Sequence, residues 1–252
     1  MFSLKNRIAV VTGASSGLGL QMAEGFAKQG ADLVLMARRI ERLEAIAENF
    51  RAQGARCLPI QCDVTKTEEI NRAAVAAIKE YGKVDILVNN AGAAKNAGVL
   101  EMTDEEWNFT IDADLTSVFK VTRAFAKYMV EKKYGRIINI ASVYGQVGNT
   151  AMDTIAYHSS KGGVINFTRA VAAELAKYNI TCNAISPGYF ETELTADTLK
   201  TEYFTNFMKT TVPLGRYGAK GELNAAAVFL ACDEASYITG QNIKVDGGFT
   251  SV

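Results

Sequence analysis

The sequence has little that could bind a metal ion or form disulfide bonds. It contains one histidine, His158, and four scattered cysteines in 252 residues. Because no CxxC pair occurs, and because zinc sites need clustered cysteines and histidines, we expect no metal site. Cysteines without a pairing pattern are typical of small buried thiols in a reducing compartment, so we expect a cytoplasmic protein.

An excess of one charge and long apolar stretches are also missing. Lys plus Arg and Asp plus Glu each number 27, so the formal net charge is zero and no nucleic-acid partner is expected. No apolar run reaches the length of about 18 residues that a membrane helix needs. The N-terminal segment also lacks the apolar core of a signal peptide, so we expect no membrane partner.

The sequence does contain short apolar runs that alternate with longer helical patterns. The runs are almost continuously apolar, as in strands buried on both faces, and cover 7–12, 32–37, 56–62, 85–89, 135–141, 180–186 and 242–245. Helices are predicted over about 17–29, 39–53, 67–81, 104–132, 155–178 and 219–232. This repetition predicts one α/β domain over residues 1–252, with a doubly wound seven-stranded parallel sheet and helices on both faces.

The first predicted strand runs into a glycine-rich turn, TGASSGLG, at residues 12–19. Glycine permits a tight turn and a close approach of the backbone to a ligand, and the N–H groups that open the next helix attract phosphate. Many such turns use glycine for geometry alone. A glycine-rich turn after the first strand nevertheless favours a dinucleotide site.

The end of the second predicted strand indicates which dinucleotide binds. NAD sites place a carboxylate there for the ribose 2′-hydroxyl, whereas this chain has Arg38 and Arg39 and no acid before Glu41. Guanidinium groups bind phosphate, so NADP(H) is predicted in preference to NAD(H). The alternative is that these arginines only form the charged start of a helix. Asp63, after the third strand, could accept a hydrogen bond from adenine or cap the next helix.

Tyr157 and Lys161 are the candidate catalytic pair. They lie four residues apart in YHSSK and therefore share one face of a predicted helix. An ammonium group near a phenol favours the phenolate, so such a tyrosine can exchange a proton with an alcohol or ketone. Ser142 ends the fifth predicted strand, at the edge where open α/β sheets bind ligands. Alone, YxxxK more often belongs to a solvated helix face.

Together these motifs resemble the short-chain dehydrogenase/reductase family over the whole chain. The glycine-rich turn, Asp63-Val64, the NNAG at 89–92, Ser142, the Tyr157/Lys161 pair and Pro187-Gly188 follow one another in that family's order and spacing. The resemblance implies a Rossmann fold. It also implies hydride transfer between a nicotinamide and a small-molecule carbonyl or alcohol.

The resemblance further implies roles for single residues. Ser142 would polarise the substrate oxygen, Tyr157 would be the general acid or base, and Lys161 would favour the phenolate and hold the nicotinamide ribose. The other cofactor-binding residues would be Gly13, Ser15, Ser16, Gly17, Leu18, Gly19, Arg38, Arg39, Asp63, Val64, Asn90, Ala91, Gly92, Pro187, Gly188, Phe190 and Thr192.

One residue departs from the family's pattern. The family has an asparagine where this chain has Asp114, in IDADLTSVF. In the family this fourth catalytic residue fixes a helix bulge whose carbonyl holds a water that links the lysine to solvent. We expect the bulge to persist and the proton relay to be altered, with Asp114 either ionised near Lys161 or protonated. The alternative is a tolerated substitution. Asp112 is expected to be an ordinary polar position on the other side of the turn.

The substrate is less well defined. The predicted pocket uses Ala94, Lys95, Tyr144, Asn149 and Tyr189, under a lid of about residues 189–212. The chain resembles most closely the sugar-acid dehydrogenases of the gluconate 5-dehydrogenase type, which implies a sugar acid or a polyol. The 3-oxoacyl-carrier-protein reductases and the hydroxysteroid dehydrogenases are the alternatives. A cofactor-binding regulatory protein without catalysis is a more remote one.

The resemblance also implies assembly. Helices 104–132 and 155–178 would pair across a two-fold axis and give a homotetramer or homodimer. His158 follows Tyr157 directly and points about 100° away from it round the helix. We therefore expect His158 to pack against its neighbours and not to act as a base.

Overall fold

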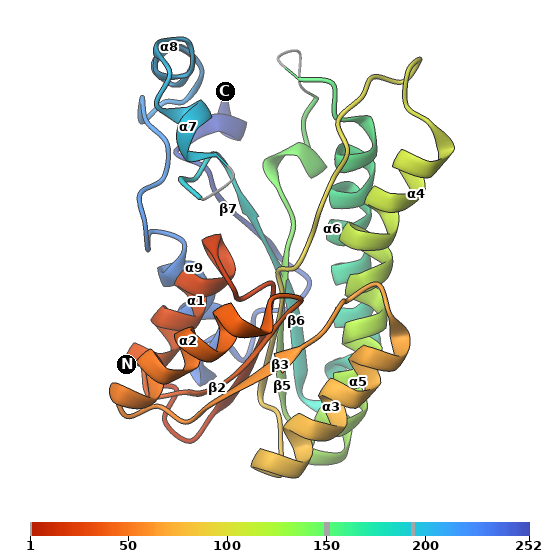
Figure 1. Cartoon of the computed structure of the whole chain (residues 1–252), viewed down its shortest axis with the longest axis vertical. Coiled ribbons are helices and arrows are strands. Elements are labelled where there is room, and N and C mark those ends of the chain that lie inside the picture. Colours follow the sequence, from red (N-terminus) through yellow and green to blue (C-terminus); the bar gives the residue numbers. More distant parts are fainter. Residues whose placement is uncertain (1, 149–151, 193–194) are drawn as a thin grey trace.

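The computed structural model of the protein describes residues 2–148, 152–192 and 195–252. In these residues a parallel sheet has seven strands in the order β3-β2-β1-β4-β5-β6-β7 (Figure 1). The strands are β1 (Ile8–Thr12), β2 (Asp32–Ala37), β3 (Cys57–Gln61), β4 (Ile86–Asn89), β5 (Gly135–Ile140), β6 (Ile180–Pro187) and β7 (Asn242–Val245). The strand order reverses between β1 and β4, so ligands are expected at the carboxyl ends of these strands.

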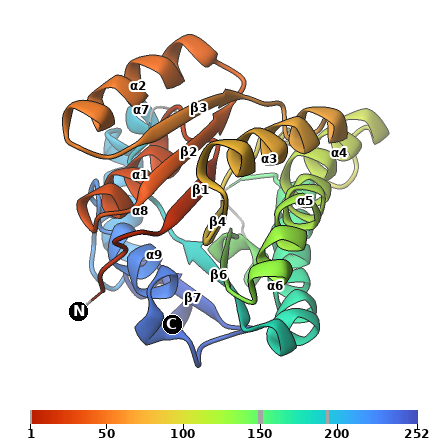
Figure 2. The same ribbon diagram turned by 90° about the horizontal axis from the view of Figure 1, so that it is seen from below.

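Helices cover both faces of the sheet, as the view in Figure 2 shows. One face carries α1 (Gly17–Lys28), α2 (Ile40–Ala52) and α9 (Asn224–Ala231), and the other carries α3 (Thr67–Tyr81), α5 (Ser117–Lys132) and α6 (Ile155–Leu175). Each face has its own core, because alternate residues of a strand point to opposite sides. Ala9 and Val11 of β1 belong to the first core, whereas Ile8 and Val10 belong to the second. The predicted fold is confirmed.

One predicted helix is interrupted. Residues 104–132 form α4 (Asp104–Ile111), a π-helical turn over Asp112–Thr116, and then α5. A π turn adds one residue to a helix and often marks a functional site. The bulge that the sequence led us to expect around Asp114 is therefore present. Thr103 fixes the start of α4, because its hydroxyl accepts the Glu106 N–H and the Glu106 carboxylate accepts the Thr103 N–H.

The segment between β6 and α9 contains two short helices, α7 (Ala196–Leu199) and α8 (Glu202–Thr211). They lie within the predicted lid, at the same end of the molecule as the C-terminus (Figure 1). The predicted helix 219–232 is shorter than expected and begins only at Asn224. All four cysteines are free and buried, as predicted. Within the described ranges, no helix has the length and apolar character needed to cross a bilayer.

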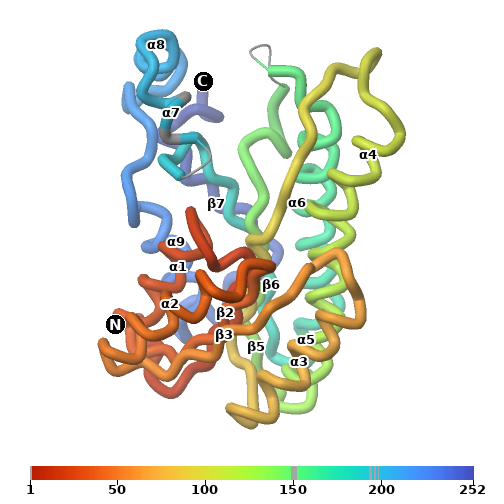
Figure 3. The backbone as a smooth tube through the Cα atoms, in the orientation of Figure 1, coloured from red at the N-terminus to blue at the C-terminus, as the bar shows by residue number. Residues whose placement is uncertain are grey.

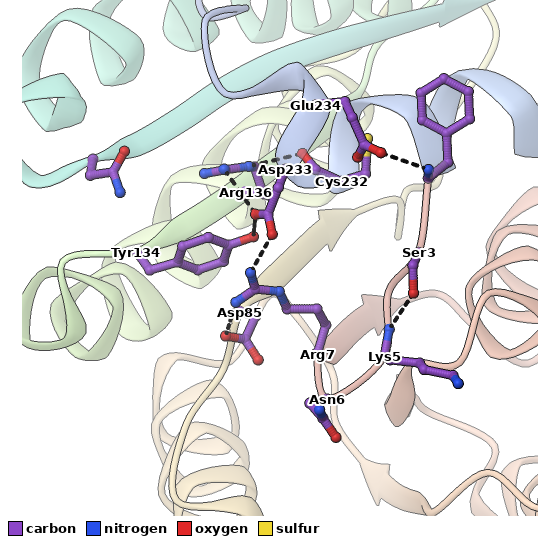
Figure 4. A network of polar contacts seen from close by, with 12 residues as sticks. Ser3, Lys5, Asn6, Arg7, Asp85, Tyr134, Arg136, Cys232, Asp233 and Glu234 are labelled. Carbon is purple, nitrogen blue, oxygen red and sulfur yellow. Dashed lines mark hydrogen bonds and ion pairs between the residues drawn. The ribbon is translucent and has the colours of Figure 1, made fainter.

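A polar network holds the amino ends of the central strands (Figure 4). The Arg7 guanidinium lies 2.7 Å from Asp233 and 3.4 Å from Asp85. The Tyr134 hydroxyl donates to Asp233 at 2.8 Å. The guanidinium carbons of Arg7 and Arg136 lie 4.0 Å and 4.5 Å from the centroid of the Tyr134 ring, and the Arg136 guanidinium lies 3.5 Å from Asp233. These contacts compensate the buried Arg136 charge and tie the start of the chain to the turn after α9.

Candidate active site

The carboxyl ends of the strands open into a cavity of about 960 Å³. The segments that follow the first six strands all line it, and Figure 3 shows those after β4, β5 and β6 running towards the end where α7 and α8 lie. All the predicted catalytic and cofactor-binding residues line this cavity except Gly19. Of the predicted substrate residues, Ala94, Tyr144 and Tyr189 line it, Lys95 does not, and Asn149 lies outside the described residues.

Glycines shape the turn between β1 and α1. Gly13 and Gly17 have φ values of +66° and +58°, a region that side chains disfavour. A Cβ on Gly13 would lie 2.9 Å from the Ala91 Cα, and one on Gly19 would lie 2.6 Å from the Gly13 carbonyl oxygen. Gly19 does not line the cavity itself, but its lack of a side chain lets α1 pack closely against the turn that does. The first turn of α1 contains no acidic residue, so its positive dipole end is not neutralised there.

Replacing Gly13 by alanine is expected to weaken NADPH binding at least about tenfold, or roughly 1.4 kcal/mol. The new Cβ would push against the loop at 90–91, which lies in the cavity wall. NADPH fluorescence titration and thermal unfolding would measure the two effects. Gly54→Ala is the control, because Gly54 also has a positive φ of +92° but nothing within 4 Å of its added Cβ. An equal loss of NADPH affinity in both variants would contradict this explanation.

Thr12 holds the loop after β4 in place, and sequence reasoning missed it. Its Oγ1 accepts the N–H groups of Asn90 at 2.9 Å and of Ala91 at 3.0 Å. The Asn90 side-chain amide donates back to the Thr12 carbonyl at 2.9 Å. Thr12 is the first letter of the glycine-rich motif. Only the pairing of β1 with β4 shows that its hydroxyl serves the neighbouring loop.

The two arginines after β2 lie at the cavity wall. The Arg39 guanidinium donates to the hydroxyls of Ser15 at 3.1 Å and Ser16 at 3.3 Å, so it is held against the glycine-rich turn. α2 begins at Ile40, and both arginines line the cavity just before it. They are therefore available to a ligand as well as being the charged start of a helix.

Asp63 also lines the cavity and does not cap the next helix. Its Oδ1 accepts the Thr65 N–H at 2.9 Å and the Thr65 hydroxyl at 2.8 Å, whereas the N-cap of α3 is Lys66. The alternative that Asp63 caps this helix is wrong, because α3 starts only at Thr67, three residues too late for it. Burial would raise the pKa of Asp63, but the Thr65 hydrogen bonds and the charge of Arg38 hold it below its usual value.

Ser142, Tyr157 and Lys161 all line this cavity. Ser142 follows β5, and its Oγ accepts the Tyr144 N–H at 3.2 Å. Tyr157 and Lys161 lie on α6, with the ammonium nitrogen 5.5 Å from the centre of the phenol ring. The Lys161 ammonium is buried and donates to the Ile140 carbonyl at 3.2 Å. The structure thus brings together a hydroxyl, a phenol and a fixed cation.

Asp114 lies at the centre of the π turn and reaches two groups of the site. Its Oδ1 accepts the Ala93 N–H at 2.7 Å, and its Oδ2 lies 3.5 Å from the Lys161 ammonium. Burial alone would lower the pKa of Lys161, but the Asp114 carboxylate and, after it, Tyr157 raise it overall. Both carboxylate oxygens face donors. This geometry favours an ionised Asp114 beside Lys161 over a protonated one.

Asp112 is exposed, as an ordinary polar position would be, and it also lines the cavity. Lys95 is exposed instead of facing the cavity, and its ammonium lies 5.8 Å from the Phe109 ring centroid. Its neighbour Asn96 lines the cavity. An unpaired loop segment has no side-chain periodicity from which this difference could be predicted.

Aromatic side chains form the wall beneath α7 and α8. The Tyr144 and Tyr189 hydroxyls are hydrogen-bonded to each other, and burial raises the pKa of both phenols. Tyr189 packs edge-on against Phe204 of α8, with ring centroids 5.2 Å apart. His158 stacks on Tyr144, and its Nδ1 lies 2.9 Å from the Thr154 carbonyl oxygen. As predicted, His158 packs against its neighbours.

Known proteins are similar to this chain over almost its whole length. A family model described as enoyl-(acyl carrier protein) reductase matches residues 13–250. Gluconate 5-dehydrogenase of Gluconobacter oxydans is 36% identical over 250 residues, which cover 99% of this chain and 97% of that protein. The 3-oxoacyl-[acyl-carrier-protein] reductase of Escherichia coli is 38% identical over 250 residues, 99% of this chain and 100% of that protein.

A solved structure agrees as closely. The crystal structure of a gluconate 5-dehydrogenase from Burkholderia cenocepacia, in complex with NADP and tartrate, gives a TM-score of 0.95 at 35% identity. The match covers 100% of this chain and 98% of that one. Since relatives with two different activities match almost equally well, overall similarity does not identify the substrate.

Proposed function

Because this chain belongs to the short-chain dehydrogenase/reductase family, we propose that it transfers a hydride between NADP(H) and a secondary alcohol or ketone. The observation that carries the proposal is the meeting of Ser142, Tyr157 and Lys161 in the cavity that the glycine-rich turn also lines. The residues present fit a dinucleotide, because the glycine-rich turn, the two arginines after β2 and the loop at 90–92 line one cavity, and the first turn of α1 has no acidic residue to repel a phosphate. When bound, the nicotinamide supplies or accepts the hydride.

The side chains of the site transfer the proton and orient the substrate oxygen. Tyr157 gives its phenolic proton to the carbonyl oxygen in reduction and takes a proton from the alcohol in oxidation. The Lys161 ammonium, 5.5 Å from the ring centre, stabilises the phenolate that forms. Ser142 donates its hydroxyl proton to the substrate oxygen and so orients it. Asp114 holds the ammonium and the loop at Ala93 in fixed positions.

NADP(H) is proposed over NAD(H) because two guanidinium groups follow β2 at the cavity wall. Arg39→Ala is expected to raise the KM for NADPH about 10- to 100-fold, since hydrogen bonds between charged groups contribute roughly 1.5–3 kcal/mol. The KM for NADH should change little, which makes NADH the internal control. Arg38→Ala, measured in the same way, shows how much each arginine contributes to the low KM for NADPH. A wild-type enzyme that prefers NADH tenfold or more would overturn the proposal.

A sugar acid or polyol is the first substrate candidate, supported by the likeness to gluconate 5-dehydrogenases. A 3-oxoacyl thioester is the second, supported by the 38% identity to the Escherichia coli reductase. NADPH consumption with 5-ketogluconate, a 3-oxoacyl thioester and keto-steroids tests them together. Cofactor binding without turnover of any ketone would instead favour a regulatory protein.

Assembly through α4, α5 and α6 into a homotetramer or homodimer also remains a proposal. Trp107 on α4 and Phe119 on α5 leave 37% and 44% of their surface exposed, which supports a further contact there. Light scattering after size-exclusion chromatography would measure the mass. A monomer at micromolar concentration would contradict the proposal.

A further inference from the structure

The cationic side chains that line the cavity are either remote from Ser142 or already paired. Arg38, Arg39 and Lys161 are the Lys and Arg residues that line it in the described ranges. The two arginines follow β2, which β1 and β4 separate from β5 with its Ser142. Lys161 is buried and already held by Asp114 and the Ile140 carbonyl. None of these three is free to bind a charge at the far end of a substrate.

The parts of the chain outside the described ranges cannot supply the missing cation. Residues 1, 149–151 and 193–194 read M, NTA and EL, so none of them has a cationic side chain. Lys95 has an exposed side chain that does not line the cavity. His158 does not line it either, and its ring is held by Tyr144 and Thr154.

The wall around the substrate position is neutral. The segments at 93–97 and 152–155 lie together, since the Ile155 N–H donates to the Ala97 carbonyl at 3.5 Å, and the Tyr144–Tyr189 hydrogen bond joins the opposite wall. Polar side chains in this lining are Asn96, Tyr144, Thr154, Tyr189 and Thr195. Apolar ones include Ala93, Ala94, Val143, Met152, Phe190 and Leu199. The exposed Asp112 of the π turn adds a negative charge to this lining, whereas the charge of Asp114 is paired with Lys161.

A carboxylate that enters this space must give up hydration without gaining a cationic partner. Amide and hydroxyl groups, in contrast, can exchange hydrogen bonds with an uncharged polar substrate. We propose that the substrate is an uncharged hydroxylated ketone or its alcohol, and that the enzyme selects against carboxylates. The inference rests on the proposed function. It narrows the first candidate from a sugar acid or polyol to a polyol.

Two matched pairs of probes test the charge preference. D-Glucitol and D-gluconate, offered with NADP⁺, differ only in a hydroxymethyl group against a carboxylate. Methyl acetoacetate and acetoacetate, offered with NADPH, differ only in an ester against a carboxylate. We expect the neutral member of each pair to have at least tenfold higher kcat/KM. Equal or better use of the charged member in either pair would overturn the inference.

Binding gives a second readout that does not need turnover. NADPH fluorescence of the Tyr157→Phe variant, which should keep NADPH but turn over about 10²- to 10⁴-fold more slowly, gives the dissociation constant of each keto probe when titrated with it. Methyl acetoacetate should bind at least tenfold more tightly than acetoacetate. Tighter binding of acetoacetate overturns the inference even if neither probe turns over. Absence of NADPH oxidation with every ketone tested would count against the proposed function and leave this comparison intact.

Two variants test whether the lack of a cation in the cavity wall causes the preference for neutral substrates. Asn96→Arg places a cation in the cavity wall and is expected to raise the charged-to-neutral ratio of kcat/KM, and of binding, at least tenfold. Lys95→Ala is the matched control, because it removes the adjacent exposed cation and should leave the ratio within twofold. A loss of carboxylate binding in Lys95→Ala would identify Lys95 as a carboxylate ligand and would overturn the inference.

Discussion

Replacing Tyr157 by phenylalanine is expected to lower kcat by about 10²- to 10⁴-fold while NADPH binding and the fold are retained. The change removes only the hydroxyl that exchanges a proton with the substrate. The ring remains, and with it the contact to the Lys161 ammonium 5.5 Å from its centre. Steady-state rates with any ketone that turns over, NADPH titration and the Tm would separate the three properties.

Tyr178→Phe is the matched control for this variant. Tyr178 also has a lysine ammonium over its ring, that of Lys177 at 5.2 Å, but it does not line the cavity. Loss of the Tyr178 hydroxyl should leave kcat within about twofold of the wild-type value, as expected for a change outside the site. If Tyr157→Phe kept more than a tenth of the wild-type rate, another group would have to be the acid.

Replacing Asp114 by alanine is expected to destabilise the protein by roughly 3–5 kcal/mol, because it leaves the Lys161 ammonium buried without its carboxylate. Asp114 is 2% exposed and Lys161 is 6% exposed, so water cannot replace the lost partner easily. The Ala93 N–H also loses its acceptor. Denaturant unfolding would measure the change. Asp32→Ala at the partly buried start of β2 is a control for the removal of a carboxylate away from the cavity.

The stability that Lys161 contributes has a defined pH dependence. The Asp114 charge raises its pKa in the folded protein above the ordinary lysine value of 10.5, against the lowering effect of burial. A raised pKa means that folding favours the bound proton, so the contribution is complete below pH 10.5 and is lost as the pH rises through the folded value. The stability difference between wild type and Asp114→Ala should therefore be constant near neutral pH and shrink above pH 10.5.

Asp114→Asn separates the role in the reaction from the role in folding. An asparagine oxygen can still accept the Ala93 N–H, but the charge near Lys161 is gone. The ammonium then acts on Tyr157 without compensation and favours the phenolate more strongly. We expect the rising limb of the pH–rate profile for alcohol oxidation to move to lower pH in this variant. Superimposable profiles would make Asp114 a tolerated substitution.

The fold could be predicted because its causes are local. Strands such as β1 and β6 are buried at every residue, and this gives continuous apolar runs that differ from the periodic pattern of the helices. The glycine-rich turn, the arginines, Asp63, the NNAG and Ser142 could be placed because each lies at the end of a predicted strand, and Tyr157 and Lys161 because they share one face of a predicted helix. In a parallel sheet all these strand ends lie at one edge, so local predictions were enough to assemble most of the cavity.

The residues that sequence reasoning misplaced depend on contacts between distant segments. Thr12 has its role only because β1 pairs with β4, and Asp63 cannot cap α3 because that helix starts only at Thr67. Lys95 and Asn96 are neighbours in a loop, and only the packing of that loop against Ile155 decides which of them faces the cavity. No pattern along the chain encodes these choices.

The π turn at Asp112–Thr116 also sets the rotational phase between two helices. A residue of an α-helix advances about 100° round the axis, so one extra residue turns everything before it by roughly that angle relative to everything after it. α5 thereby keeps Val121 and Phe125 against the sheet while Phe109, on α4, reaches the cavity. An insertion or deletion within this turn would rotate α4 relative to α5. The side chains that α4 presents to the cavity would then change, while the residues that α5 packs against the sheet would stay the same.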